Sequence, residues 1–192
     1  MFTCGPILTL SVVLLVGCGK ELQPIESTRS VAKVEPRTKG AFMKNVEGSW
    51  QGKKTLWTKF PDNPQESDIK LVVSSELVEY QWSYEGKAQT GTFNFKEGNT
   101  KEGDSGVRVE WVDSWHSRDV LISTGSEEDG VTKVSGTYSF GDGPAWAWRT
   151  EFYANDPAHF SIKMFNKLPA GLYPEMQERE LPAVVIELTR IP

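Results

Sequence analysis

A two-residue alternation of apolar and polar side chains runs through most of this chain and restricts its fold more than any other feature. It is clearest at Val78, Tyr80, Trp82 and Tyr84, which alternate with Glu, Gln and Ser. Side chains that alternate in this way lie on opposite faces of a β-strand, so one face is buried and the other meets water. The same pattern returns at residues 107–111, 134–140, 146–152, 160–164 and 184–188.

Turn-forming sequences separate these segments, among them Glu85-Gly86 and Asp129-Gly130. We therefore predict an all-β fold of about ten strands joined mostly by hairpin-length connections, which makes an antiparallel meander. Closing such a meander into a barrel removes its unpaired edges, and an open β-sandwich is the alternative. The predicted strands lie near residues 46–58, 68–74, 77–85, 88–95, 106–113, 119–125, 131–140, 145–154, 159–166 and 182–190.

The net charge of −5 and the lack of a Lys/Arg cluster argue against nucleic acid as a partner. The chain has two cysteines, Cys4 and Cys18, both near its beginning. A domain made from the later residues therefore has no disulfide and no cysteine zinc site. Two histidines, His116 and His159, do not make a usual zinc site on their own, so we predict no metal.

An uncharged apolar run of ten residues, 7–16, precedes Gly17 and Cys18. A transmembrane helix needs about 20 apolar residues, so this run fits a signal peptide. Leu15-Val16-Gly17-Cys18 resembles the lipobox of bacterial lipoproteins, which implies a lipid on Cys18. The alternatives are an ordinary cleaved signal and an uncleaved anchor.

The expected organisation is a signal peptide at 1–17, a lipidated Cys18 with a flexible tether at 18–40, and the barrel domain at 41–192. The resemblance implies an exported lipoprotein, anchored in a membrane of the bacterial cell envelope through Cys18. Gly19 follows the cysteine where inner-membrane lipoproteins carry Asp, which favours the outer membrane.

Gly48-Ser49-Trp50 lies on the first predicted strand, and Arg190 lies on the last. This pair resembles the signature of the calycin superfamily, which includes the lipocalins. The resemblance implies that the Trp50 indole packs against Arg190 where the two ends of a closed barrel meet. Haem binding is not supported, because the glycine-rich opening strand of the haem-binding barrels is not reproduced, and we predict no cofactor.

Three further segments, 80–86, 113–116 and 143–149, resemble in this order the bacterial family known as domain of unknown function 1579. The resemblance covers roughly residues 46–190. The family is similar to calycin-type barrels and implies no settled activity.

Asp113-Ser114-Trp115-His116 is the segment richest in reactive groups, and two interpretations compete. In one, Asp113 orients the His116 imidazole for general-base catalysis or ligand binding. In the other, Asp113 caps a turn and His116 closes a hairpin. Arg149 raises a similar choice between a ligand's acidic group and a surface ion pair with Glu151 or an acid on a neighbouring strand.

The aromatic residues either line an apolar ligand pocket or fill the core. We expect the barrel to bind a small apolar or amphipathic ligand. One alternative is a structural or interaction protein of the envelope without a ligand. The other is an enzyme that uses Asp113 and His116, and we rank it last. The candidate ligand-binding residues are Trp82, Trp111, Trp115, His116, Trp146 and Trp148.

Overall fold

The computed structural model describes residues 41–99, 105–138, 145–170 and 178–192. In that part of the chain, one short helix, α1 (Ala41–Val46), precedes ten strands. The predicted signal peptide, Cys18 and the tether lie outside the described residues. The strands are β1 (Gly48–Leu56), β2 (Gln65–Ser74), β3 (Leu77–Tyr84), β4 (Lys87–Asn99), β5 (Ser105–Asp113), β6 (Ser117–Glu128), β7 (Val131–Tyr138), β8 (Trp146–Asp156), β9 (His159–Leu168) and β10 (Arg179–Arg190).

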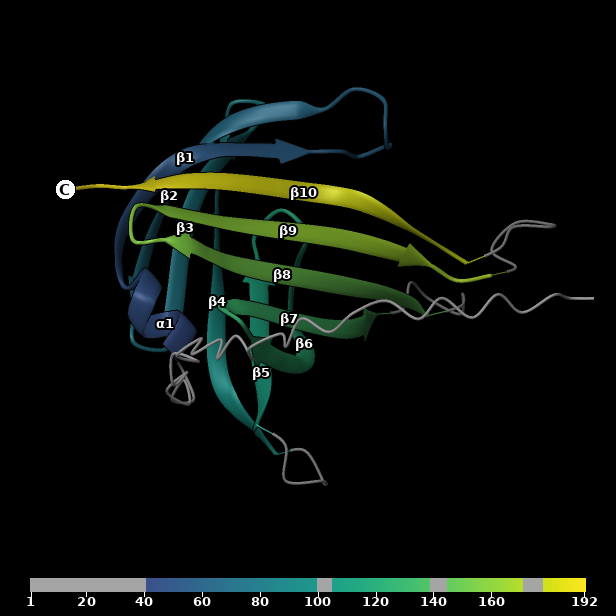
Figure 1. Cartoon of the computed structure of the whole chain (residues 1–192). Coiled ribbons are helices and arrows are strands. Elements are labelled where there is room, and N and C mark those ends of the chain that lie inside the picture. The colour runs from purple at the N-terminus through teal and green to yellow at the C-terminus, as the bar shows by residue number, and fades with distance from the viewer. Residues whose placement is uncertain (1–40, 100–104, 139–144, 171–177) are drawn as a thin grey trace, which may run out of the picture. The chain divides into compact units, whose positions relative to one another are not determined.

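The strands form one closed antiparallel barrel with meander order (Figure 1). Each strand pairs with its neighbours in the chain, and β1 also pairs with β10, from Trp50 opposite Arg190 to Leu56 opposite Val184. The predicted ten-stranded barrel is confirmed, and the sandwich alternative is wrong because no edge is left between β1 and β10. The strand ends differ from the prediction by a few residues, chiefly where β4 continues to Asn99.

Two tight turns show how local sequence sets the meander. Glu85 and Gly86 join β3 to β4 with φ values of 48° and 75°, and Asp129 and Gly130 join β6 to β7 with 50° and 79°. Two-residue hairpin turns that match the twist of the strands need positive φ at both positions. Glycine supplies this conformation at the second position without a steric cost.

The helix α1 closes one end of the barrel, and the sequence did not predict it. Phe42 is 1% exposed, and its ring centroid lies 5.8 Å from that of Phe95, 6.0 Å from Phe152 and 5.8 Å from Phe160. The Phe42 backbone amide donates to the Glu127 carboxylate at 2.9 Å. With six residues, α1 has fewer than two turns, too short to show a clear helical repeat of apolar side chains in the sequence.

The same end carries the contact expected between Trp50 and Arg190. The Arg190 guanidinium lies 4.3 Å from the centroid of the Trp50 ring, and the Trp50 indole donates to the Val46 carbonyl at 2.7 Å. Arg190 also donates to the carbonyls of Asn45 at 2.9 Å, Pro157 at 2.7 Å and Glu47. The Arg190 side chain thus connects α1, the start of β1 and the β8–β9 turn through its hydrogen bonds.

Gly48 explains the remaining part of that motif. Its φ is 130°, and a Cβ there would lie 2.6 Å from Nη1 of Arg190. Glycine is needed both for the backbone conformation and for the approach of the guanidinium.

Within the described ranges, no helix is long and apolar enough to cross a membrane.

Candidate functional site

The barrel interior holds a cavity of about 20 Å³ at the end away from α1, which we call the far-end cavity. A cavity of about 10–15 Å³ by this measure holds one water molecule, so the space admits one small polar group. The polar lining comes from β1, β3 and β5, and aromatic and aliphatic side chains form the remaining walls. The lining includes Lys54, Tyr80, Trp111, Asp113, Trp115 and Trp148.

Asp113 is the most connected group in this cavity. Its Oδ2 accepts from the Tyr80 hydroxyl at 2.7 Å, and that hydroxyl accepts from the Trp111 indole at 2.7 Å. Its Oδ1 accepts from the backbone amides of Trp115 at 2.8 Å and His116 at 3.1 Å. Burial, assisted by the charge of Asp113, raises the pKa of Tyr80 well above its ordinary value of 10.0. Tyr80 therefore keeps its proton and holds the carboxylate in place.

The His116 imidazole belongs to an aromatic stack. Its ring centroid lies 5.2 Å from that of Trp111 at an interplanar angle of 13°, and 5.4 Å from that of Trp148. Asp113 contacts the backbone amide of His116, so the structure has a capped turn between β5 and β6, as in the second interpretation. Burial lowers the pKa of His116 against the opposing charge of Asp113, which favours a neutral ring.

Lys54 is the basic side chain of this cavity lining. It is 5% exposed, and its Nζ lies 2.7 Å from the centroid of the Trp82 ring. Among the described residues, Nζ has neither a hydrogen-bond nor an ion-pair partner, although Asp113 lines the same cavity. Burial lowers the pKa of Lys54 from 10.5 to about 7, and the charge of Asp113 only partly opposes this shift. The Trp82 indole Nε1 is also buried without an acceptor.

The five predicted tryptophans fall into three positions. Trp111, Trp115 and Trp148 line the far-end cavity, and the centroids of Trp111 and Trp148 lie 5.1 Å apart. Trp82 lies next to this group, 6.0 Å from Trp115, and carries the contact with Lys54. Trp146, on β8, packs beside Tyr138 and is outside the cavity lining.

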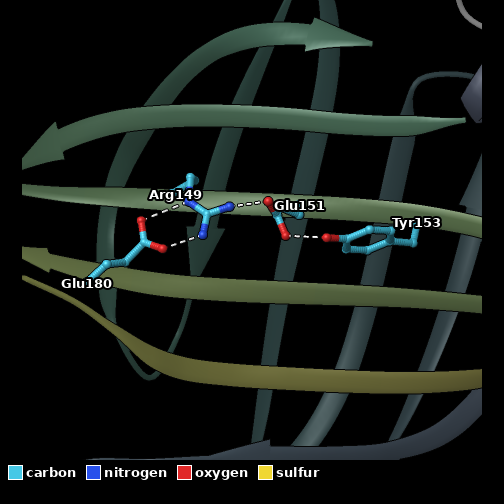
Figure 2. A network of polar contacts seen from close by, with 4 residues as sticks. All are labelled: Arg149, Glu151, Tyr153 and Glu180. Carbon is cyan, nitrogen blue, oxygen red and sulfur yellow. Dashed lines mark hydrogen bonds and ion pairs between the residues drawn. The ribbon is translucent and has the colours of Figure 1, made fainter. Parts of the chain in front are cut away.

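The outer surface carries a polar network that Figure 2 shows. Arg149 forms ion pairs with Glu151 and Glu180, and Tyr153 donates to the other oxygen of Glu151. The Arg149 guanidinium lowers the pKa of Glu180. These contacts place Arg149 in surface ion pairs, the second of its two alternatives, and Glu151 is 7% exposed because its neighbours cover it.

A shallow groove of about 760 Å³ lies over β1, β8, β9 and β10. Its charged side chains include Lys53 and Lys163, and His159 lies within 3.0 Å of both carboxylate oxygens of Asp156. In the part of the chain that the structure describes, no group of three His, Cys, Asp or Glu side chains is placed to hold a metal ion. The far-end cavity is the better candidate site, because it combines enclosure with Lys54, an amine that has no acceptor among the described residues.

Sequence reasoning missed Lys54, although the signal was present. Lys54 is separated by an even number of residues from Trp50 and Leu56 on β1, and both of these are buried. The alternation along the strand therefore predicts that Lys54 faces inward.

Comparison with protein-family models and with curated proteins finds no match to this chain.

Proposed function

We propose that this chain is an exported lipoprotein, anchored through Cys18, whose barrel binds a small amphipathic ligand at the far end. The observation that supports the ligand most is Lys54, a buried lysine that lines an aromatic cavity and has no acceptor in the part of the chain that the structure describes. A buried polar group without a partner costs free energy, and a bound acceptor removes that cost.

The chemistry of the far-end cavity indicates the ligand's two parts. Asp113 already accepts three hydrogen bonds, whereas Lys54, in the same lining, has no acceptor among the described residues. The polar part should therefore accept hydrogen bonds. The apolar part would lie among the tryptophan rings, and half-buried Trp115 would have to move to admit anything larger than the cavity. The closed barrel and the Trp50–Arg190 contact support a place for the chain among calycin-type barrels.

The binding proposal is tested with 1-anilinonaphthalene-8-sulfonate, which joins apolar rings to an acceptor group. We expect saturable fluorescence enhancement with the full chain at pH 6, where Lys54 is largely protonated, and at least about tenfold weaker binding to the Lys54→Met variant. The matched control is Lys53→Met, because Lys53 precedes Lys54 on β1 but is 67% exposed. Equal affinities for all three proteins, or no saturable binding, would contradict the proposal.

The anchor is tested by fractionating cells that express the full chain. The Cys18→Ser variant should move to the soluble fraction, because the lipid supplies the membrane affinity. Cys4→Ser is the matched control and should stay with the membranes. If Cys18→Ser remains membrane-bound, the anchor proposal is wrong.

A further inference from the structure

Two consecutive lysines on β1 have opposite environments. Lys53 points outward and forms a 2.6 Å ion pair with Asp68, which raises its pKa. Lys54 points inward, contacts the face of Trp82, and has its pKa lowered to about 7 by burial. At pH 7 about half of Lys54 is a free amine with an available lone pair, whereas Lys53 is almost wholly protonated.

A free amine in an apolar cavity is a nucleophile toward carbonyl carbon. The Lys54 side chain is 5% exposed, and its Nζ lies against the face of the Trp82 ring without a hydrogen-bond acceptor among the described residues. The far-end cavity beside it admits one group of about the size of a water molecule. A carbonyl group of a small aldehyde is of that size, and the tryptophan rings suit a short alkyl tail.

The other polar groups of the cavity suit the proton transfers that such a reaction needs. Asp113 is held by Tyr80 and two backbone amides, so its carboxylate has a fixed position on the cavity wall. Tyr80 keeps its own proton and does not compete for the amine.

We propose that Lys54 reversibly binds small aliphatic aldehydes as an imine inside the barrel. The Nζ lone pair forms a bond to the carbonyl carbon while the carbonyl π electrons move to oxygen. One proton moves from nitrogen to that oxygen to give a carbinolamine. The nitrogen lone pair then forms the C=N bond as the C–O bond breaks, and the hydroxyl leaves as water with the second proton from nitrogen, so aldehyde and amine give imine and water. Asp113 transfers protons between nitrogen and the departing oxygen. This inference rests on the proposed ligand site, because the aldehyde enters the same cavity.

The test is reductive trapping of the full chain at pH 7 with propanal and sodium cyanoborohydride, which reduces an imine to a stable N-propyl amine. Fragment-ion mass spectrometry then locates the propyl group. We expect Lys54 to be labelled at least about tenfold faster than Lys53, its exposed neighbour. The comparison is made within the wild-type chain, so it does not depend on whether a variant folds. In Lys54→Met the fast site should disappear while the slow surface labelling is unchanged.

Titration with 1-anilinonaphthalene-8-sulfonate in the same preparations separates the two proposals. If the dye binds and Lys54 is not labelled faster than Lys53, the imine proposal is wrong and the binding proposal stands. If Lys54 is labelled rapidly but the dye does not bind, the imine is supported and the site takes aldehydes but not larger amphipathic ligands. If neither occurs, both are overturned.

Discussion

Replacing Lys54 with methionine should remove a pH dependence of folding stability that this one residue creates. In the folded protein the pKa of Lys54 is about 7, whereas its ordinary value is 10.5. Between these two pH values the unfolded chain binds more protons at this site than the folded chain does. The free energy of unfolding of the wild type therefore rises as pH rises through this window, and the site's full penalty is present below pH 7.

The size of the effect follows from the two pKa values. Each unit of pKa shift corresponds to about 1.4 kcal/mol, so the wild type should gain about 2 kcal/mol from this site between pH 7 and pH 9. Lys54→Met lacks this gain, since methionine does not titrate and keeps a similar length of apolar chain in the core.

Urea unfolding followed by tryptophan fluorescence at pH 7 and pH 9 measures the difference. The rise should be about 2 kcal/mol larger in the wild type than in Lys54→Met, and Lys53→Met should behave as the wild type does. Other titrating groups are common to all three proteins and cancel. An equal change in the wild type and Lys54→Met would refute the claim that Lys54 is a buried amine of lowered pKa.

Three further substitutions test the framework, each read as the free energy of unfolding in urea. Arg190→Met should lower the free energy of unfolding by about 2 kcal/mol, because it removes hydrogen bonds to three carbonyls and the contact with Trp50. The same change at exposed Arg179 should lower it by less than about 0.5 kcal/mol. Equal losses would contradict the claim that Arg190 stabilises this end of the barrel. Tyr80→Phe should cost about 2–3 kcal/mol, because it leaves the buried Trp111 indole N–H without its acceptor and Oδ2 of Asp113 without the Tyr80 donor, whereas an effect as small as that of a surface change would contradict the network. Gly91→Ala should cost about 1–3 kcal/mol, because its Cβ would lie 2.2 Å from the Tyr80 ring; a neutral result would show that the ring can move aside.

The strands could be predicted because their signal is local. Alternation at Val78, Tyr80 and Trp82 and the turn at Glu85-Gly86 fix the position of one hairpin without any knowledge of the rest. Closure was predicted from the unpaired edges that it removes and from a resemblance, since nothing local in Trp50 or Arg190 says that the two will meet. Helix α1 was not predicted because six residues are too few to show a helical repeat. In addition, Phe42 is held by contacts with rings on three strands that are distant in the sequence.

The candidate site was harder to predict than the fold. The sequence identified most of the aromatic residues at the far end but could not say how much space they leave, because packing depends on ring orientations. The role of Asp113 also depends on the turn after β5, which turns two backbone amides toward its carboxylate. Lys54 could have been found, since it alternates in phase with Trp50 and Leu56.

Native mass spectrometry of the full chain, purified from its own host, tests the central claim most directly. The account predicts a complex heavier than the lipidated protein by one small molecule, which collisional activation releases. The Lys54→Met chain should carry little or none of that mass, whereas Lys53→Met should carry as much as the wild type. If the wild-type chain carries no additional mass, or carries the same mass without Lys54, the claim that the far-end cavity binds a ligand through Lys54 is contradicted.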